Sequence, residues 1–128
     1  FRYKYRFLSL RMEKYVIKHI KKVSKFLENR ILVLKGPNTV IADGQNNIYV
    51  IEKGTYNLGT AGTGDILSGI ISSYVASGYT LIDAAIIGAS IHSHISFILM
   101  SKNIRSITAS EMFSYINQSQ NYFLNYHD

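Results

Sequence analysis

The stretch Asn57-Leu58-Gly59-Thr60-Ala61-Gly62-Thr63-Gly64-Asp65 marks a loop that runs into a helix and decides how the rest of the chain is interpreted. Three glycines fall within six residues, a carboxylate follows the last one, and an apolar helical pattern begins at Ile66. Glycine backbone turns tightly and approaches a ligand closely, and a helix N-terminus presents free N–H groups with a partial positive charge. Asp65 stands at the same place and can act as a base on a hydroxyl held beside a phosphate. The stretch therefore predicts a phosphoryl-transfer site.

Two common phosphate-binding motifs do not fit this stretch. No Gly-Lys-Ser/Thr follows, as a Walker A motif requires, and the glycine spacing is G-x-x-G-x-G rather than the G-x-G-x-x-G of dinucleotide sites. A simpler interpretation is an ordinary N-capped helix in which Asp65 only complements the helix dipole. A cap needs one good residue and not three preceding glycines, so a functional loop is favoured. A carboxylate at a helix N-terminus stays ionised, as a base must be.

The segment before this loop predicts one helix and three strands. Residues 12–29 show a helical pattern with an apolar face and a lysine face. Residues 31–34 form a continuous apolar run, which is typical of a buried strand in an α/β sheet. Residues 39–42 and 48–51 predict a strand pair joined by a turn at Asp43-Gly44. The apolar face of the helix holds Val16, Ile20, Val23 and Leu27.

Three helices are predicted after the loop. The first carries apolar residues at helical spacing from Ile66 to a stop at Gly78. Pairs that resemble capping boxes, Thr80 with Asp83 and Thr108 with Glu111, open the second and third helices. The second runs to about residue 100, and residues 121–128 look frayed.

The predicted element order gives the fold class. Three strands make too small a sheet to cover so many helices. We therefore expect residues 1–128 to form a single α/β domain that corresponds to the second half of a larger one.

Composition excludes several classes of protein. The chain has 128 residues, of which 47% are hydrophobic, so a globular domain with a core is expected. The absence of cysteine excludes disulfides and cysteine–zinc sites, and it fits a reducing cytosol. No apolar stretch looks long enough to span a bilayer, because Gly69, Gly78 and Asp83 interrupt the best one. A soluble cytoplasmic protein without a membrane partner is the expectation.

Charge is spread unevenly along the chain. Residues 1–35 hold 11 Lys and Arg and 2 acidic residues, whereas the remainder holds 3 and 6. A basic segment can attract nucleic acid or an anionic surface. Here the lysines follow one helix face without a recognised nucleic-acid module, so a solvated face is favoured and nucleic acid is not an expected partner. Residues 1–11 alternate basic and aromatic types, which suits an edge strand or an irregular start.

A second candidate binding segment is Lys35-Gly36-Pro37-Asn38-Thr39, which directly follows the apolar run at residues 31–34. Ligands of α/β sheets bind at strand ends. Lys35 and Thr39 are candidates to contact phosphate, and Gly36 lets the backbone come close. The alternative is an ordinary turn, because Gly-Pro-Asn is turn chemistry by itself. The presence of the second glycine-rich loop favours function.

Two histidines lie near the middle of the second predicted helix. His92 and His94 are two residues apart and therefore point to different faces, so they cannot easily share a metal ion. We expect them on the helix surface or partly buried, and no metal site is predicted.

Taken together, Leu32–Ala42 and Asn57–Ile71 resemble the ADP/ATP-dependent NAD(P)H-hydrate dehydratases, which belong to the ribokinase-like superfamily. The similarity covers about residues 31–120, and Asp83–Ala85, Gly88 and His92 resemble the helix that follows in the family. The resemblance implies an α/β fold, the C-terminal portion of a ribokinase-like αβα sandwich with a small sheet and hairpin followed by three helices.

The resemblance also implies a repair reaction. Hydrated NADH or NADPH is phosphorylated on its new hydroxyl by ADP or ATP, phosphate then leaves, and the nicotinamide ring is restored. Mg²⁺ is expected to accompany the nucleotide phosphates. By the family pattern, Asp65 is the catalytic base, and the other site residues bind the nucleotide and the transferred group. The anion hole comprises Gly62, Thr63 and Gly64, and the remaining binding residues are Lys35, Gly36, Pro37, Asn38, Thr39 and Asn57.

Several alternatives remain open at the level of sequence. The N-terminal half of the family fold has no counterpart here, so the chain is a fragment, a split-gene product or a remnant that only binds nucleotide. Another ribokinase-like small-molecule kinase is a further possibility, although residues 35–39 favour the dehydratase. An exposed sheet edge favours a homo-oligomer or pairing with the missing half.

Overall fold

The computed structural model describes residues 10–36, 38–52, 56–104 and 106–125. Of the alternating basic and aromatic pattern at residues 1–11, only the last two residues are described, and they begin the first helix. The elements in chain order are α1 (Leu10–Ser24), β1 (Leu32–Leu34), β2 (Thr39–Ala42), β3 (Ile48–Ile51), the 3-10 helix η1 (Tyr56–Gly59), α2 (Thr63–Ala76), α3 (Leu81–Ser101), α4 (Ala109–Phe113) and α5 (Ile116–Leu124).

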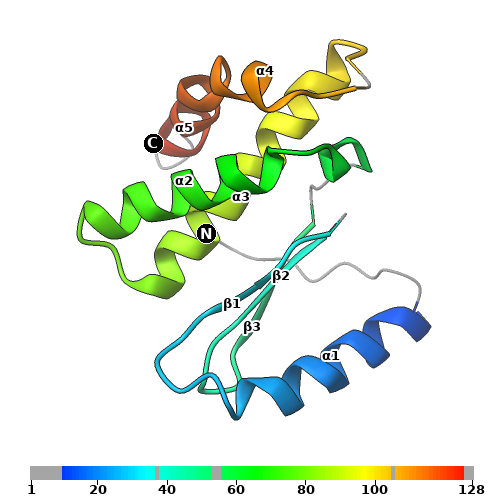
Figure 1. Cartoon of the computed structure of the whole chain (residues 1–128), viewed down its shortest axis with the longest axis vertical. Helices are drawn as coiled ribbons and strands as arrows, with labels where there is room; N and C mark the ends of the chain where they lie inside the picture. The colour runs from blue at the N-terminus through cyan, green and yellow to red at the C-terminus, as the bar shows by residue number, and fades with distance from the viewer. Residues whose placement is uncertain (1–9, 37, 53–55, 105, 126–128) are drawn as a thin grey trace.

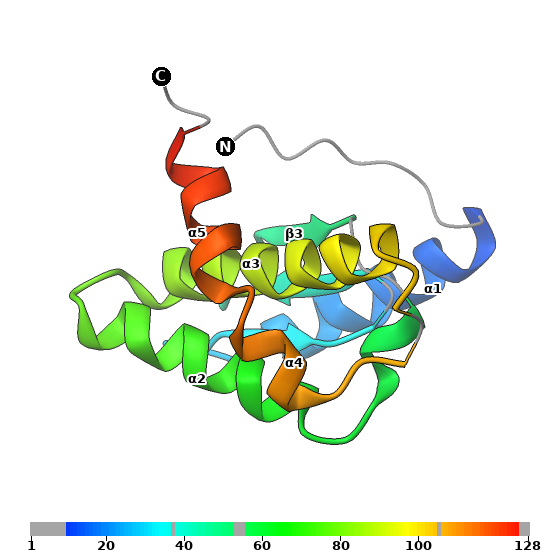
Figure 2. The same ribbon diagram turned by 90° about the horizontal axis from the view of Figure 1, so that it is seen from above.

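Helices cover both faces of a small sheet (Figure 1). The strands are antiparallel in the order β1-β2-β3, and successive side chains point to opposite faces. Val40 and Ala42 pack with Ile20 of α1, whereas Ile41 and Ile51 pack with residues of α2 and α3. Viewed from above, α3 runs along β3 and α5 rises beside α3 (Figure 2). The expected α/β class is confirmed.

The hairpin formed by β2 and β3 follows the predicted ranges of residues. Thr39 pairs with Ile51 and Ala42 with Ile48. The turn is held by Asp43, whose carboxylate accepts hydrogen bonds from the backbone N–H groups of Gln45 and Asn47 at 2.8 and 2.9 Å. An aspartate that bonds the backbone two residues ahead is typical turn chemistry.

The first helix ends earlier than predicted. α1 stops at Ser24 rather than near residue 29, because a series of turns brings the chain back toward the sheet and Glu28 adopts a positive φ of 51°. Ile20 is buried as expected, with Val16 and Leu27 packed beside it. Val23 was predicted on the same face and is instead 45% exposed.

The first strand lies at the edge of the sheet. β1 pairs with β2 and has no second partner strand among the described residues. As a result Leu34 is 45% exposed, although the apolar run at residues 31–34 predicted a buried strand. A strand at the edge buries less of each side chain than a central one does, which explains the difference.

Helix α3 corrects the expectation that no apolar stretch is long enough to cross a membrane. Its 21 residues satisfy that test of length and composition, because Gly78 precedes the helix and Asp83 lies in its first turn. In this structure 78% of its most apolar window is buried inside the protein. A helix that is apolar on most sides is also what a core position produces.

Both predicted capping pairs are present, but the last helix is divided in two. Thr108 accepts from the Glu111 backbone N–H, and the Glu111 carboxylate accepts from the Thr108 N–H in return. The helix opened by this box stops at Phe113, and α5 continues to Leu124 through residues predicted to be frayed. The break lets α4 pack on α2 and α5 pack on α3, so the described residues after the loop form four helices instead of three.

Two helical glycines give a matched pair for a stability prediction. A Cβ on Gly88 of α3 would lie 2.5 Å from Ile71 Cγ1 and 3.3 Å from the Ile71 backbone of α2, whereas one on Gly69 of α2 meets nothing within 4 Å. We expect Gly88→Ala to lower the free energy of unfolding by about 1–3 kcal/mol through overpacking. Gly69→Ala should raise it by up to about 1 kcal/mol, because alanine is the better helix former. Urea unfolding followed by circular dichroism measures both, and equal effects would contradict the close α2–α3 contact.

Candidate active site

The glycine-rich loop enters α2 without a side-chain cap. The N-cap residue is Gly62 in the left-handed conformation, with φ of 85°, and it makes no capping hydrogen bond through a side chain. A Cβ at this position would lie 3.0 Å from the Ala109 Cβ of α4. Glycine is therefore required here both by the backbone angle and by the neighbouring helix. The turn therefore differs from a helix start that is capped by a side chain, and the functional interpretation of the loop stays a prediction.

The backbone amides of the first turn of α2 are only partly engaged. The Asp65 and Ile66 amides bond the Gly62 carbonyl, and the Thr63 amide reaches the Thr60 carbonyl at 3.4 Å. Within the described part of the chain, the Gly64 amide has no hydrogen-bond partner, and a Cβ at Gly64 would project into open space. Free amides at a helix start are the arrangement that binds anions.

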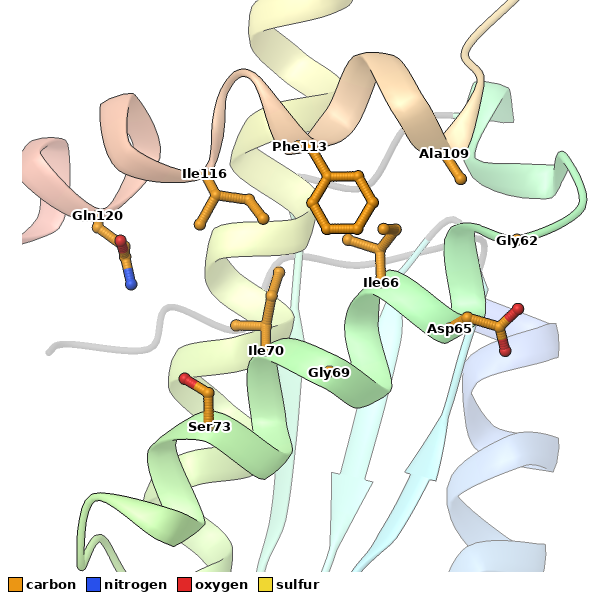
Figure 3. A pocket seen from close by; sticks show the side chains of 10 residues that line it. All are labelled: Gly62, Asp65, Ile66, Gly69, Ile70, Ser73, Ala109, Phe113, Ile116 and Gln120. Carbon is orange, nitrogen blue, oxygen red and sulfur yellow. The ribbon is translucent and has the colours of Figure 1, made fainter.

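Asp65 lies in the first turn of α2 with an exposed side chain. Figure 3 shows its carboxylate pointing outward near Gly62, at one end of a groove between α2 and the helices α4 and α5. A base needs access to the proton that it removes, and this position provides it next to the free Gly64 amide.

The groove beside Asp65 has a volume of about 520 Å³, within the usual range of small-molecule sites. Apolar side chains dominate its middle, and Ser73 and Gln120 lie at the end away from Asp65 (Figure 3). The lining residues are Gly62, Asp65, Ile66, Gly69, Ile70, Ser73, Ala109, Phe113, Ile116 and Gln120.

The structure brings the two predicted binding segments together through Lys35. Its ammonium group donates to the Thr63 hydroxyl at 2.6 Å and to the Leu58 carbonyl at 2.9 Å. The Thr63 hydroxyl in turn lies 2.7 Å from that same carbonyl oxygen. Partial burial lowers the pKa of Lys35 from its usual value. Lys35 thus stands at the start of α2, where it ties the loop to the end of β1.

The remaining predicted site residues occupy varied positions. Gly36 and Asn38 are half-buried beside Lys35 in the chain. Thr39 is 2% exposed at the start of β2, where it pairs with Ile51. Pro37 lies outside the described residues, and so does the side chain of Asn57, whose backbone belongs to η1.

The histidines are more buried than predicted. His92 is 1% exposed and His94 is 7% exposed, and their different partners, Thr63 of α2 and Ser119 of α5, place them on different sides of α3. His94 lies 3.0 Å from the Ser119 hydroxyl and stacks on Tyr122. His92 Nε2 lies 2.8 Å from the Thr63 carbonyl oxygen. Since a carbonyl only accepts, that nitrogen carries the proton.

The contact between His92 and the loop was missed by sequence reasoning. One local signal was available, because His92 follows Gly88 by four residues and therefore lies on the same helix face. A Cβ on Gly88 would lie 3.3 Å from the Ile71 backbone, so that face of α3 turns toward α2, the helix into which the glycine-rich loop leads.

The lowered pKa of the buried His92 side chain leads us to expect that the protein loses stability in mild acid. Burial, more than the nearby Lys35 charge, lowers the pKa of His92 from 6.5 to about 4. Between these two values the unfolded chain binds a proton that the folded chain does not, so the free energy of unfolding falls as the pH falls. We expect about 2 kcal/mol to be lost between pH 7 and pH 5 through this residue. Urea unfolding at both pH values measures it, and His92→Gln should show a shallower dependence; an identical dependence would contradict the assignment.

Comparison with known proteins identifies the family. The model of the NAD(P)H-hydrate dehydratase family matches residues 6–118, which is most of the chain. This chain belongs to the NAD(P)H-hydrate dehydratase family. The resemblance carried by the two glycine-containing segments is thereby confirmed.

Similar proteins include curated members of the same family. The bifunctional NAD(P)H-hydrate repair enzyme Nnr of Dictyoglomus turgidum is 40% identical over 82 residues, covering 63% of this chain and 16% of that protein. The ADP-dependent (S)-NAD(P)H-hydrate dehydratase of Neisseria meningitidis is 48% identical over 61 residues, covering 48% of this chain and 21% of that protein. The chain thus spans about a fifth or less of the length of these relatives.

A solved structure extends the likeness to the fold. YxkO of Bacillus subtilis, a member of the UPF0031 family, superposes with a TM-score of 0.79 over 88% of this chain, at 22% sequence identity. The match covers 42% of YxkO. This likeness confirms that the NAD(P)H-hydrate dehydratase family chain shares the α/β fold of YxkO.

Proposed function

We propose that this chain carries the phosphoryl-transfer centre of an ADP- or ATP-dependent NAD(P)H-hydrate dehydratase. The observation that carries the proposal is the free Gly64 amide next to the exposed Asp65 carboxylate at the start of α2. Hydrated NADH or NADPH is the substrate, and the nucleotide is the phosphoryl donor. The choice of substrate is supported by the membership of the chain in the NAD(P)H-hydrate dehydratase family.

The chemistry assigns one task to each group. Asp65 takes the proton from the hydroxyl of the hydrated nicotinamide as that oxygen bonds to the phosphorus of the nucleotide, whose bond to the leaving nucleotide breaks. The amides of Gly62, Thr63 and Gly64 stabilise the charge on the transferred phosphoryl group. For Thr63 this requires the amide to exchange its long 3.4 Å contact with the Thr60 carbonyl for the phosphoryl oxygen. The phosphate then leaves the ring, the adjacent ring carbon loses a proton, and the double bond is restored.

The segment at residues 35–39 is assigned to the nucleotide. Its support is the 2.6 Å contact between Lys35 and Thr63, which places the segment directly beside the amide loop. In this assignment Lys35, Gly36, Pro37, Asn38 and Thr39 line the phosphates or the adenosine, and Asn57 belongs to the same set. Mg²⁺, when bound with the nucleotide, would neutralise part of the phosphate charge.

Such a reaction belongs in the cytoplasm, which the lack of cysteine also favours.

The edge strand β1 bears on two proposals, the extent of the domain and the partner that pairs with its sheet. We propose that residues 1–128 form one domain equivalent to the C-terminal half of the family fold. Among the described residues no strand pairs with the outer edge of β1, Leu34 is partly exposed there, and the chain matches 42% of YxkO. The N-terminal half of the family fold, or a second copy of this chain, would pair along this edge.

Recovery of NADH absorbance from hydrated NADH is the experiment that tests the function. The purified protein is incubated with hydrated NADH and either ATP or ADP, and nucleotide binding is measured separately by calorimetry. Turnover that depends on nucleotide supports the proposal and reveals which nucleotide is preferred.

A second candidate function is a non-catalytic nucleotide-binding remnant, which the partial coverage of the relatives favours. Binding of ADP or ATP without any turnover would favour this candidate. Absence of both binding and turnover would overturn the proposed phosphoryl-transfer centre.

A further inference from the structure

We propose that His92 is a positioning residue for the amide loop, because through the Thr63 carbonyl it sets the direction of the Gly64 N–H group. This inference rests on the proposed function of the loop as the anion hole. His92 does not touch the reacting atoms. It acts through the peptide bond that joins Thr63 to Gly64.

The geometry of that peptide bond links the two groups. No cis peptide is present among the described residues, so the Thr63 carbonyl and the Gly64 N–H belong to one planar trans unit and point in opposite directions. The carbonyl accepts from His92 Nε2 at 2.8 Å. The Gly64 N–H therefore points away from that hydrogen bond, and no other described group engages it.

Thr63 is held from two sides. His92 bonds its carbonyl, and the Lys35 ammonium bonds its hydroxyl at 2.6 Å. The Thr63 side chain is fully buried, with 0% exposure, and the His92 side chain is 1% exposed. Donors held by buried partners keep their orientation when charge develops, which is what an anion hole requires.

The position of His92 is fixed by the hydrophobic core of the protein. His92 lies in the middle of α3, a helix of 21 residues that is mostly buried. Gly88, one turn earlier, brings α3 against Ile71 of α2. The distance between the imidazole and the loop is therefore set by helix packing and not by a mobile segment.

A neutral imidazole is the form that this position requires. The Lys35 ammonium already stands on the other side of Thr63, and a second cation there would be repelled. Burial and this charge both lower the pKa of His92, so the donor at pH 7 is a neutral N–H group.

The test compares three variants of the whole protein labelled with ¹⁵N. His92→Leu removes the donor while remaining apolar, His92→Gln keeps an N–H donor at a similar place, and His94→Leu alters the other buried histidine of α3. The backbone order parameter of Gly64 is measured without ligand, and ADP affinity is measured by calorimetry.

The expected result separates positioning from folding. In His92→Leu, the Gly64 order parameter should fall from about 0.85 toward 0.6, and ADP should bind about tenfold more weakly, as loss of one hydrogen bond implies. His92→Gln should restore most of both, and His94→Leu should change neither. Should His92→Leu fail to fold, the Gly64 order parameter is compared between His92→Gln and Lys35→Met, which releases the Thr63 hydroxyl. The order parameter should fall in Lys35→Met and stay near its original value in His92→Gln. ADP affinity is not compared for Lys35→Met, because Lys35 is itself assigned to the nucleotide.

Two results would overturn the inference. One is a folded His92→Leu variant with an unchanged Gly64 order parameter; the other is equal loss of ADP affinity in His92→Leu and His94→Leu. If the unmodified protein binds neither ADP nor ATP and shows no turnover, the proposed function fails instead, and the order parameter alone then decides whether His92 positions the loop.

Discussion

Asp65→Asn is expected to lower turnover of hydrated NADH by about 10³-fold while ADP binding stays within about twofold. The amide cannot accept the proton of the substrate hydroxyl, yet it occupies the same space at the exposed first turn of α2. The Gly64 amide, which we assign to the phosphoryl group, is not altered by this change. Single-turnover measurement of NADH recovery, with calorimetry for ADP, tests both halves of the expectation.

Asp83→Asn provides the matched control for this variant. Asp83 also lies in the first turn of a helix, α3, and its carboxylate accepts from the Thr80 hydroxyl at 2.6 Å. Both variants remove one negative charge near a helix N-terminus, but only Asp65 borders the groove. Equal loss of turnover in the two variants, or full activity in Asp65→Asn, would show that Asp65 is not the base.

Gly62→Ala is expected to combine a loss of stability with a loss of nucleotide affinity. A residue with a Cβ pays about 1–2 kcal/mol in the left-handed conformation, and Gly62 has φ of 85°. The added Cβ would also lie 3.0 Å from the Ala109 Cβ, so α2 and α4 must move apart. We expect the free energy of unfolding to fall by about 2–3 kcal/mol in total, and ADP to bind about tenfold more weakly as the amides shift.

Gly78→Ala separates the two contributions. Gly78 has φ of 91°, but a Cβ there meets nothing within 4 Å, and the residue follows the C-terminal end of α2. This variant should show the backbone contribution alone, with unchanged ADP affinity. Urea unfolding and calorimetry on both variants give the comparison; equal destabilisation would mean that the Ala109 contact contributes nothing.

Features that depend on a few neighbouring residues were predictable from the sequence. The β2–β3 hairpin follows from period-two apolar spacing around Asp43, and the two capping pairs follow from threonine and an acidic residue three positions later. The glycine-rich loop and its junction with a helix were recognisable because its glycines and Asp65 are adjacent in the chain, and its assignment as an anion site stays a prediction. Backbone chemistry of this range acts within one turn or one hairpin.

The predictions that were wrong concern positions where tertiary packing, and not the local sequence pattern, decides the structure. The apolar run at residues 31–34 has the composition of a buried strand, but its exposure depends on which strands stand beside it, and β1 is at the edge. The helical pattern to residue 29 continued past Ser24, where the chain must turn to reach the sheet. Neither outcome is encoded within a short window of sequence.

The sequence by itself determined the family-specific segments, the hairpin and the position of Asp65 at the start of a helix. Only the tertiary structure decided that Lys35 reaches Thr63 across 28 residues and that His92 reaches it across 29. These contacts exist because α3 packs on α2 at Gly88 and the end of β1 faces the loop. Local propensity acts over a few residues, whereas the partners of a buried polar group are set by how whole elements pack.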